Sequence, residues 1–320
     1  MVSLKYADYA GWSQALWVQK GDLALILTPQ VGGRVMGVQW RSHDLYWVNS
    51  ELAGRFVDVA AIKQPEIAKK TLGFLLWGGN KTWLAPQEHW IDSLPFLDLD
   101  SGAYQVAVDT VSDQAVRIVM TSPICRETGT QLQRIIQLGD TDHHWSITHR
   151  LENQGDDIIQ WGLWGNSMVQ RPATVFLPIG TQSQFPRGVK TFANEGMAAA
   201  VRDNVVRWMD DTVSVQCTEP IKFKYGVDAP LGAILAILST PQGTLGYLKQ
   251  FSITSAATYG HDCVAEVFNA SDYPYLEMEI HGPVQFLAPG ESCELVVHHR
   301  LIELESASIS DQEARDLLYQ

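Results

Sequence analysis

The chain has 320 residues, 46% of them hydrophobic and 18% charged, and its 23 basic and 36 acidic side chains give a net charge of −13. This composition is typical of a globular protein with a large core and excludes a disordered chain. Lys and Arg do not cluster along the sequence, so we expect neither nucleic acid nor a membrane surface as a partner.

The N-terminal residues 1–12 show no basic segment followed by an apolar run, and the sequence has no apolar stretch long enough for a membrane span. Four cysteines lie far apart without a CxxC pair: Cys125, Cys217, Cys263 and Cys293. We therefore expect buried free thiols, no cofactor and a reduced, cytoplasmic location.

Apolar alternation predicts successive strands in the first half of the chain. They are expected at 15–19, 23–28, 35–40 and 45–48, then within 103–121, 130–139, 143–152 and 158–168, with turns at 139–142 and 153–157. Residues 61–74 fit either a short helix or a loop. The segment 76–90, LWGGNKTWLAPQEHW, has no clean period and is interpreted as a loop of the kind that carries function.

The second half continues this pattern. Residues 175–223 are expected to be loop-rich with short strands, followed by strands at 231–238, 245–251, 263–268, 275–281 and 293–302. Ser310 and Glu313 form a capping box that predicts a short helix at about 310–319. Frequent alternation and few helical periods together predict an all-β sandwich, formed by a single domain over residues 1–320.

The strand at 275–281, YLEMEIH, has two chemically different faces. Alternation places Leu276, Met278 and Ile280 on an apolar face, and the other face carries Tyr275, Glu277, Glu279 and His281. The polar row fits the solvated side of a half-exposed strand. It fits equally a polar cleft whose side chains bind a ligand and move protons.

Tryptophan is frequent near the segment 76–90 and the strand 158–168. A Trp ring suits the C–H face of a sugar, although any one Trp can instead be part of the core. The residues concerned are Trp77, Trp83, Trp90, Trp161 and Trp164, and their polar neighbours Asn80, Lys81, Gln87 and His89 favour a sugar cleft.

Three basic residues stand out beside the expected strands, and one of them has two interpretations. Arg34 follows Gly32 and Gly33, so its guanidinium either is displayed at a strand end, ready for hydroxyls or a carboxylate, or is an ordinary surface group of a hairpin. Lys222 and Lys224 alternate and share a face, which is typical of a solvated sheet edge.

The histidines do not predict a metal site. His143–His144 and His298–His299 are adjacent pairs on expected strands, where neighbouring side chains point to opposite faces. HxH and HExxH spacings with a matching carboxylate are missing from the sequence, so we expect no metal.

Four segments in this order carry a resemblance to a known family: LILTPQVGGRVMGVQW, LWGGNKTWLAPQEHW, LENQGDDIIQWGLWGN and YLEMEIHGPVQFLAPGES. Together they resemble the galactose mutarotase-like (aldose 1-epimerase) superfamily, and are most similar to its poorly characterised bacterial branches. The resemblance implies a large antiparallel β-supersandwich whose concave face binds carbohydrate. Tyr275, Glu277, Glu279 and His281 would line that face.

The resemblance also implies roles. In the family's mutarotases a Glu on the late strand takes the proton of the anomeric hydroxyl, and a His on the middle strand protonates the ring oxygen. The resemblance places Glu279 at the position of the base, whereas Asn166 stands where the family shows its histidine. An amide cannot act as a general acid at neutral pH. Either His281 or His89 supplies the proton, or the reaction is not ordinary mutarotation.

The expected function is therefore anomer interconversion of a small free or acidic sugar by an aldose 1-epimerase-like isomerase. Glu279 and His281 are the expected catalytic residues, and the substrate-binding residues are expected to be Arg34, Lys81, Trp83, Gln87, His89, Trp164, Asn166 and Glu277. The alternatives are a non-catalytic sugar-binding protein and a polysaccharide lyase or hydrolase. The sequence leaves open whether Glu266 faces the cleft or solvent.

Overall fold

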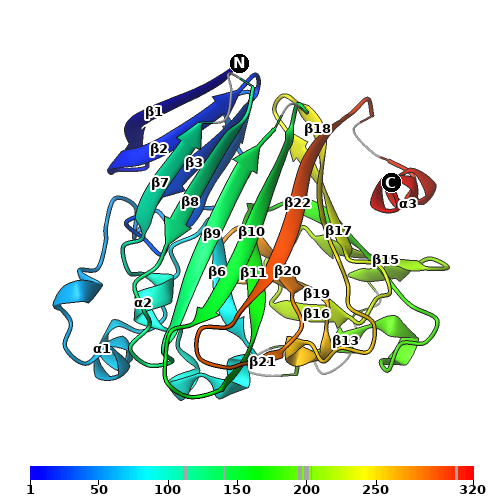
Figure 1. The fold of residues 1–320 in the computed structure, drawn as a ribbon. Coiled ribbons are helices and arrows are strands. Elements are labelled where there is room, and N and C mark those ends of the chain that lie inside the picture. Colours follow the sequence, from blue (N-terminus) through cyan, green and yellow to red (C-terminus); the bar gives the residue numbers. More distant parts are fainter. Residues whose placement is uncertain (111–113, 140, 194–196, 198–201, 203, 307–308) are drawn as a thin grey trace.

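A computed structural model describes residues 1–320 except 111–113, 140, 194–196, 198–201, 203 and 307–308. The described chain forms two large antiparallel sheets that lie against each other as two layers (Figure 1). The β9–β10–β22 region of one sheet lies in front of β6, β11 and β20 of the other in this view.

The first sheet has 12 described strands. Its main path is β1 (Val2–Tyr9), β2 (Trp12–Lys20), β3 (Leu23–Thr28), β4 (Arg34–Trp40), β6 (Asn80–Ala85), β11 (Ile159–Gln170), β20 (Tyr275–His281), β19 (Ala265–Asn269), β16 (Phe223–Val227) and β13 (Lys190–Thr191). Two short strands pair beside this path, β5 (His43–Asp44) with β4 and β21 (Gln285–Leu287) with β11.

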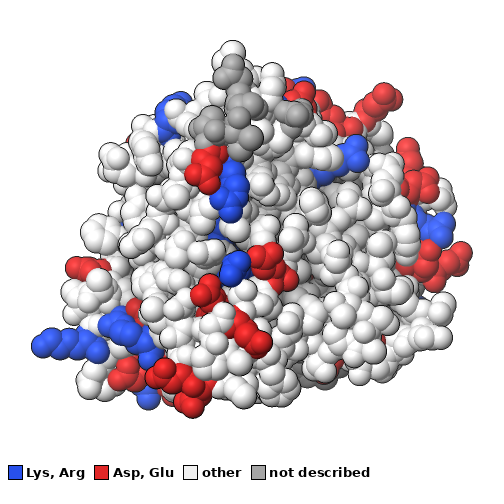
Figure 2. Space-filling model, viewed as in Figure 1, with Lys and Arg blue, Asp and Glu red and all other residues white. Residues whose placement is uncertain are grey.

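The second sheet has 10 described strands. Its order is β14 (Val206–Trp208), β15 (Thr212–Cys217), β12 (Ala173–Pro178), β17 (Ala233–Thr240), β18 (Gly243–Phe251), β22 (Ser292–Leu304), β10 (His144–Asn153), β9 (Thr130–Leu138), β8 (Val116–Thr121) and β7 (Gln105–Thr110). The face that this sheet turns to the viewer in Figure 2 is mostly uncharged, and its charged side chains lie in small groups that mix both signs.

The core lies between the two sheets. Leu276, Met278 and Ile280 of β20 belong to the same buried cluster as Ile147 of β10 and Val297 of β22. The three apolar residues of β20 therefore face the other sheet, as the alternation predicts.

Helices are few among the described residues. The α-helices are α1 (Pro65–Leu72), α2 (Leu97–Asp100) and α3 (Asp311–Leu318), and the 3-10 turns are η1 (Val59–Ala61), η2 (Gln87–His89), η3 (Ile91–Ser93), η4 (Pro186–Gly188) and η5 (Gly260–Asp262). The Ser310–Glu313 capping box is formed, and Ala314 and Leu318 of α3 pack with Phe176 and Leu235. In the described chain, no helix is both long enough and apolar enough to cross a membrane.

The structure confirms the predicted all-β sandwich with a short C-terminal helix, and all four cysteines are buried free thiols. Some local predictions were wrong. Segment 76–90 contains β6, residues 45–48 form only isolated bridges, His143 lies in a turn with positive φ, and β1 and α2 were not foreseen. Parts of the predicted segments 103–121, 139–142 and 175–223 lie outside the described residues.

Candidate functional site

The second face of β20 is the polar row that alternation predicts, and it is buried. Glu279 and His281 are fully buried, and Glu277 and Tyr275 keep 8% and 5% of their surface exposed. The interpretation of this row as the solvated side of a strand is therefore wrong. A buried row of acids and an imidazole must find partners, and the neighbouring strands supply most of them.

Strand pairing brings polar residues from four strands into one line. Asn166 of β11 lies opposite Lys81 of β6 on one side and Glu279 of β20 on the other, and Glu279 lies opposite Glu266 of β19. Directly opposed residues of antiparallel strands point to the same face. We call Lys81, Asn166, Lys224, His261, Glu266, Glu277, Glu279 and His281 the polar cluster.

Glu279 is held by one of its two carboxyl oxygens. Its Oε2 accepts hydrogen bonds from Trp164 Nε1 and Lys224 Nζ, both at 2.8 Å, whereas its Oε1 has no partner among the described residues. Burial raises the pKa of Glu279 to about 8, since the nearby Glu266 and Glu277 charges add to the effect of burial and outweigh Lys224. This carboxyl group consequently keeps its proton at neutral pH.

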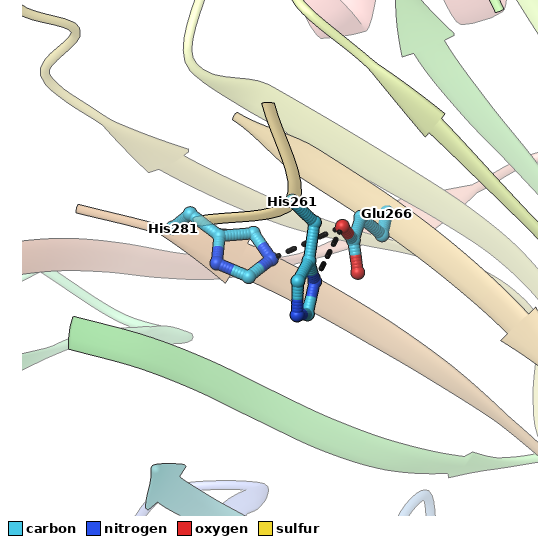
Figure 3. A group of neighbouring side chains, drawn as sticks. All are labelled: His261, Glu266 and His281. Carbon is cyan, nitrogen blue, oxygen red and sulfur yellow. Dashed lines mark hydrogen bonds and ion pairs between the residues drawn. The ribbon is translucent and has the colours of Figure 1, made fainter. Parts of the chain in front are cut away.

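Glu266, whose orientation the sequence left open, faces the polar cluster and is fully buried. Its Oε1 lies 3.0 Å from His261 Nδ1 and 3.3 Å from His281 Nε2 (Figure 3). Its Oε2 lies 2.6 Å from Lys224 Nζ. Burial acts to raise the pKa of Glu266, but Lys224, His281 and His261 outweigh it and hold the pKa well below its usual range. Glu266 is thus the ionised partner of the protonated Glu279.

His261, Glu266 and His281 are also the one group of described residues whose donor atoms, all within 4.8 Å of one another, could surround a metal ion. Two contacts disfavour a metal ion between these three side chains and favour a proton there instead. The Lys224 ammonium already lies 2.6 Å from Glu266. The backbone N–H of Gln87 donates to His261 Nε2 at 3.3 Å, which leaves the ring proton on Nδ1, the atom that would have to bind the metal.

Several buried atoms of the polar cluster have no partner among the described residues. They are both side-chain atoms of Asn166, Oε1 of Glu279 and Nδ1 of His281. Two more have a charged or polar neighbour but no hydrogen-bond geometry: His281 Nε2, beside Glu266, and Glu266 Oε2, beside Lys224. Burial lowers the pKa of His281 to about 4, so its ring is neutral at pH 7 although Glu266 lies beside it. Unsatisfied buried polar atoms are costly, and a group of them on one face points to a ligand rich in hydroxyl groups.

Lys81 and Glu277 form the next contact along this face. Lys81 Nζ lies 3.2 Å from Glu277 Oε1, 3.3 Å from Met168 Sδ and 4.0 Å from the centre of the Trp83 ring. Burial lowers the pKa of Lys81, and the Glu277 charge opposes that shift. Lys81 therefore already has an acidic partner at the place where the sequence analysis expected it to hold a sugar.

Two predictions about basic residues were wrong. Arg34 is neither displayed at a strand end nor on the surface: it is 1% exposed and lies 2.6 Å from Asp100 Oδ1. Lys224 is not at a solvated edge, because β16 pairs with β19 on one side and β13 on the other, and its side chain reaches both Glu266 and Glu279. Its interaction with these two acids raises its pKa despite the opposing effect of burial.

The tryptophans are more deeply buried than a sugar platform would be. Trp83 is 6% and Trp164 is 2% exposed, and the Trp164 ring stacks on His281 at 5.4 Å between ring centres. Gln87 reaches the polar cluster through its backbone N–H, whereas the exposed His89 contacts Trp161 outside it. His89 is accordingly a poor candidate for the missing proton donor.

Sequence reasoning missed Lys224 and His261 as members of this site. The alternation of Lys222 and Lys224 showed that the two side chains share a face. The sequence did not show which strands lie on either side of β16, and so it did not show that this face is buried at Lys224. His261 lies in the short turn η5 with a φ of 56°, a left-handed conformation that periodicity does not reveal.

No family model matches the chain, and no curated protein matches its sequence. Solved structures do match. The galactose mutarotase-like protein from Lactobacillus casei ATCC 334 has 8% sequence identity and a TM-score of 0.56, with 90% of this chain and 100% of the other covered. This chain has the galactose mutarotase-like fold.

Two further solved structures are similar to this chain over nearly its whole length. The Slr1438 protein from Synechocystis sp. PCC 6803 has 14% identity and a TM-score of 0.59, covering 94% of this chain and 98% of the other. A galactose mutarotase-like protein from Clostridium acetobutylicum has 10% identity and a TM-score of 0.53, covering 95% and 99%. At this low sequence identity, the similarity to galactose mutarotase-like structures shows the fold alone. It confirms the fold expected from the sequence.

Proposed function

We propose that the polar cluster binds a sugar and interconverts its anomers by acid–base chemistry. The observation that carries this proposal is the set of buried, unpartnered polar atoms on Asn166, Glu279 and His281. Sugar hydroxyl groups both donate and accept hydrogen bonds, so they can satisfy an amide, a carboxyl group and an imidazole at once.

The electrostatics support proton transfers in the opposite direction to the sequence expectation for Glu279. Glu279, with a pKa of about 8, holds a proton and donates it to the ring oxygen. His281, with a pKa of about 4, is neutral and accepts the anomeric hydroxyl proton on Nδ1, while Glu266 faces Nε2. The ring opens to the aldehyde, C1 rotates, and both protons return as the ring recloses, so no net proton is consumed.

Access to these atoms requires movement at the rim of the polar cluster. Glu279 and Asn166 are fully covered, whereas the side chains of Lys224, His261 and Glu277 keep 11%, 12% and 10% of their surface exposed. These three side chains are the ones that a sugar meets first.

The test is anomer exchange of a panel of hexoses, followed by NMR exchange spectroscopy. Glu279→Gln should slow exchange by about a hundredfold to ten-thousandfold, the usual contribution of a general acid. Because Glu279 is assigned as the donor, the wild-type rate should fall as pH rises through about 8, and it should also fall as pH drops through about 4, where His281 becomes protonated.

Glu294→Gln is the matched control, because Glu294 is an exposed acid on β22 whose partner is Arg150. It should leave exchange unchanged. Exchange that persists in Glu279→Gln contradicts the assignment, and a rate that rises through pH 8 would make Glu279 the base instead.

The second candidate is a sugar-binding protein without catalysis. Asn166 favours it, because an amide stands at the position where the resemblance expects a histidine. Saturable sugar binding by a wild-type protein that exchanges none of the anomers would establish this alternative.

A further inference from the structure

We propose that the site takes an uncharged sugar and that the Lys81–Glu277 ion pair excludes sugars that bear a carboxylate or a phosphate. This inference rests on the proposed function and adds the class of substrate.

Each cation that the described chain places on this face already has a carboxylate partner. Lys81 lies 3.2 Å from Glu277, Lys224 lies 2.6 Å from Glu266, and Arg34 lies 2.6 Å from Asp100. An anionic ligand would have to displace one of these acids, which would then remain buried without a counter-charge. The arrangement therefore penalises anions.

The atoms that remain available are uncharged. They belong to the Asn166 amide, to the His281 ring, which burial keeps neutral, and to Glu279, whose raised pKa keeps it protonated at pH 7. Such groups exchange hydrogen bonds with hydroxyl groups but do not neutralise a charge. A neutral polyol satisfies them without bringing a net charge into a buried site.

Lys81 and Glu277 control this preference because their ion pair is at the rim. The Glu277 side chain is 10% exposed and the Lys81 side chain 3% exposed, so an incoming ligand meets the acid before the amine. Removing the Glu277 charge would take from Lys81 its ion-pair partner and leave the Met168 sulfur and the Trp83 ring as its direct contacts, with the Asp100 charge beyond ion-pair distance. The freed ammonium could then bind an anion.

The experiment compares D-glucose and D-galactose with D-glucuronate and D-glucose 6-phosphate, each measured for saturable binding and for anomer exchange by NMR. We expect the wild type to prefer the neutral sugars by about tenfold or more, the effect of one charge-assisted hydrogen bond. Glu277→Gln should raise the ratio of anionic to neutral sugar binding by a similar factor. Glu294→Gln, which removes the same charge from a distant ion pair, should leave that ratio unchanged.

The outcomes separate the two proposals. A wild type that prefers glucuronate or glucose 6-phosphate overturns the uncharged-sugar inference and leaves the proposed function standing. A wild type that neither binds nor exchanges any of the four overturns both. The wild-type comparison decides the point even where Glu277→Gln fails to fold, and a folded Glu277→Gln with an unchanged ratio removes the Lys81–Glu277 pair from the explanation.

Discussion

The two faces of β11 carry two buried polar regions that differ in how their atoms are satisfied. On the face between the sheets, Asn80 donates to Ser167 Oγ at 2.9 Å and to the Asn166 carbonyl at 3.0 Å, and its own side-chain oxygen accepts from Arg134. On the other face, the Asn166 side chain has no partner among the described residues. Two buried asparagines on adjacent strands are thus in opposite situations.

The inter-sheet region continues this pattern of internal pairing. Tyr247 joins Tyr46 at 2.6 Å and His299 at 2.8 Å, Thr82 joins His149 at 2.6 Å, and Lys249 donates to Ser167 Oγ and the Met278 carbonyl. Only scattered atoms there, such as Arg134 Nε and His299 Nε2, are without a partner in the described chain. Polar groups that are satisfied internally fix the packing, whereas unsatisfied ones are available to a ligand.

The largest stability effect that this comparison predicts is at Asn80. Asn80→Ala should lower the free energy of unfolding by about 3 kcal/mol, because it removes the side-chain acceptor of the buried Arg134 Nη2 and one of the hydrogen-bond donors to the buried Ser167 Oγ. Urea denaturation measures the loss. If Asn80→Ala loses less than about 1 kcal/mol, the inter-sheet hydrogen bonds do not distinguish the two regions.

The pH dependence of stability should also separate the regions. Burial raises the pKa of Glu279 from 4.5 to about 8, so the folded state holds the extra proton and stability falls as pH rises between these values. Burial lowers the pKa of Lys249 from 10.5 to about 7, so the unfolded state holds the extra proton and stability rises with pH over that range.

Unfolding by urea at successive pH values tests both directions. Glu279→Gln should remove the decrease between pH 4.5 and 8, and Lys249→Met should remove the increase between pH 7 and 10.5. A Glu279→Gln profile identical to that of the wild type would mean that Glu279 is ionised in the folded protein.

The smallest expected effect is at Asn166. Asn166→Leu should raise the free energy of unfolding by about 1 kcal/mol, because it replaces an unsatisfied buried amide by an apolar side chain of similar size. The same variant should lose sugar binding in the NMR assay. A destabilised Asn166→Leu protein would show that the amide is satisfied in the folded protein and is not reserved for a ligand.

The sequence predicted this site where the pattern was local. The period of two in Tyr275–His281 placed Glu277, Glu279 and His281 on one face, because Leu276, Met278 and Ile280 had to enter the core. The same rule fails for β6, because polar residues lie on both of its faces: Asn80 and Thr82 face the other sheet, and Lys81 faces Glu277.

The remaining members of the site depend on contacts between distant segments. Arg34 contacts Asp100, which lies 66 residues away in the sequence, and Lys224 contacts Glu279, which lies 55 residues away. The identity of neighbouring strands decides whether a lysine is at an edge or inside a sheet, and the sequence of β16 alone does not specify its neighbours. Lys224 was misplaced for this reason.

The double contact of Lys224 has a consequence for sequence variation among homologues. One ammonium contacts both the ionised Glu266 and the protonated Glu279 of adjacent strands, at 2.6 and 2.8 Å, so a change at any of the three positions leaves a buried charge or hydrogen-bonding group without its partner. We expect Lys224, Glu266 and Glu279 to vary as a unit among distant homologues, conserved together or replaced together. Homologues that have lost the acid–base chemistry of this site should lack all three residues together.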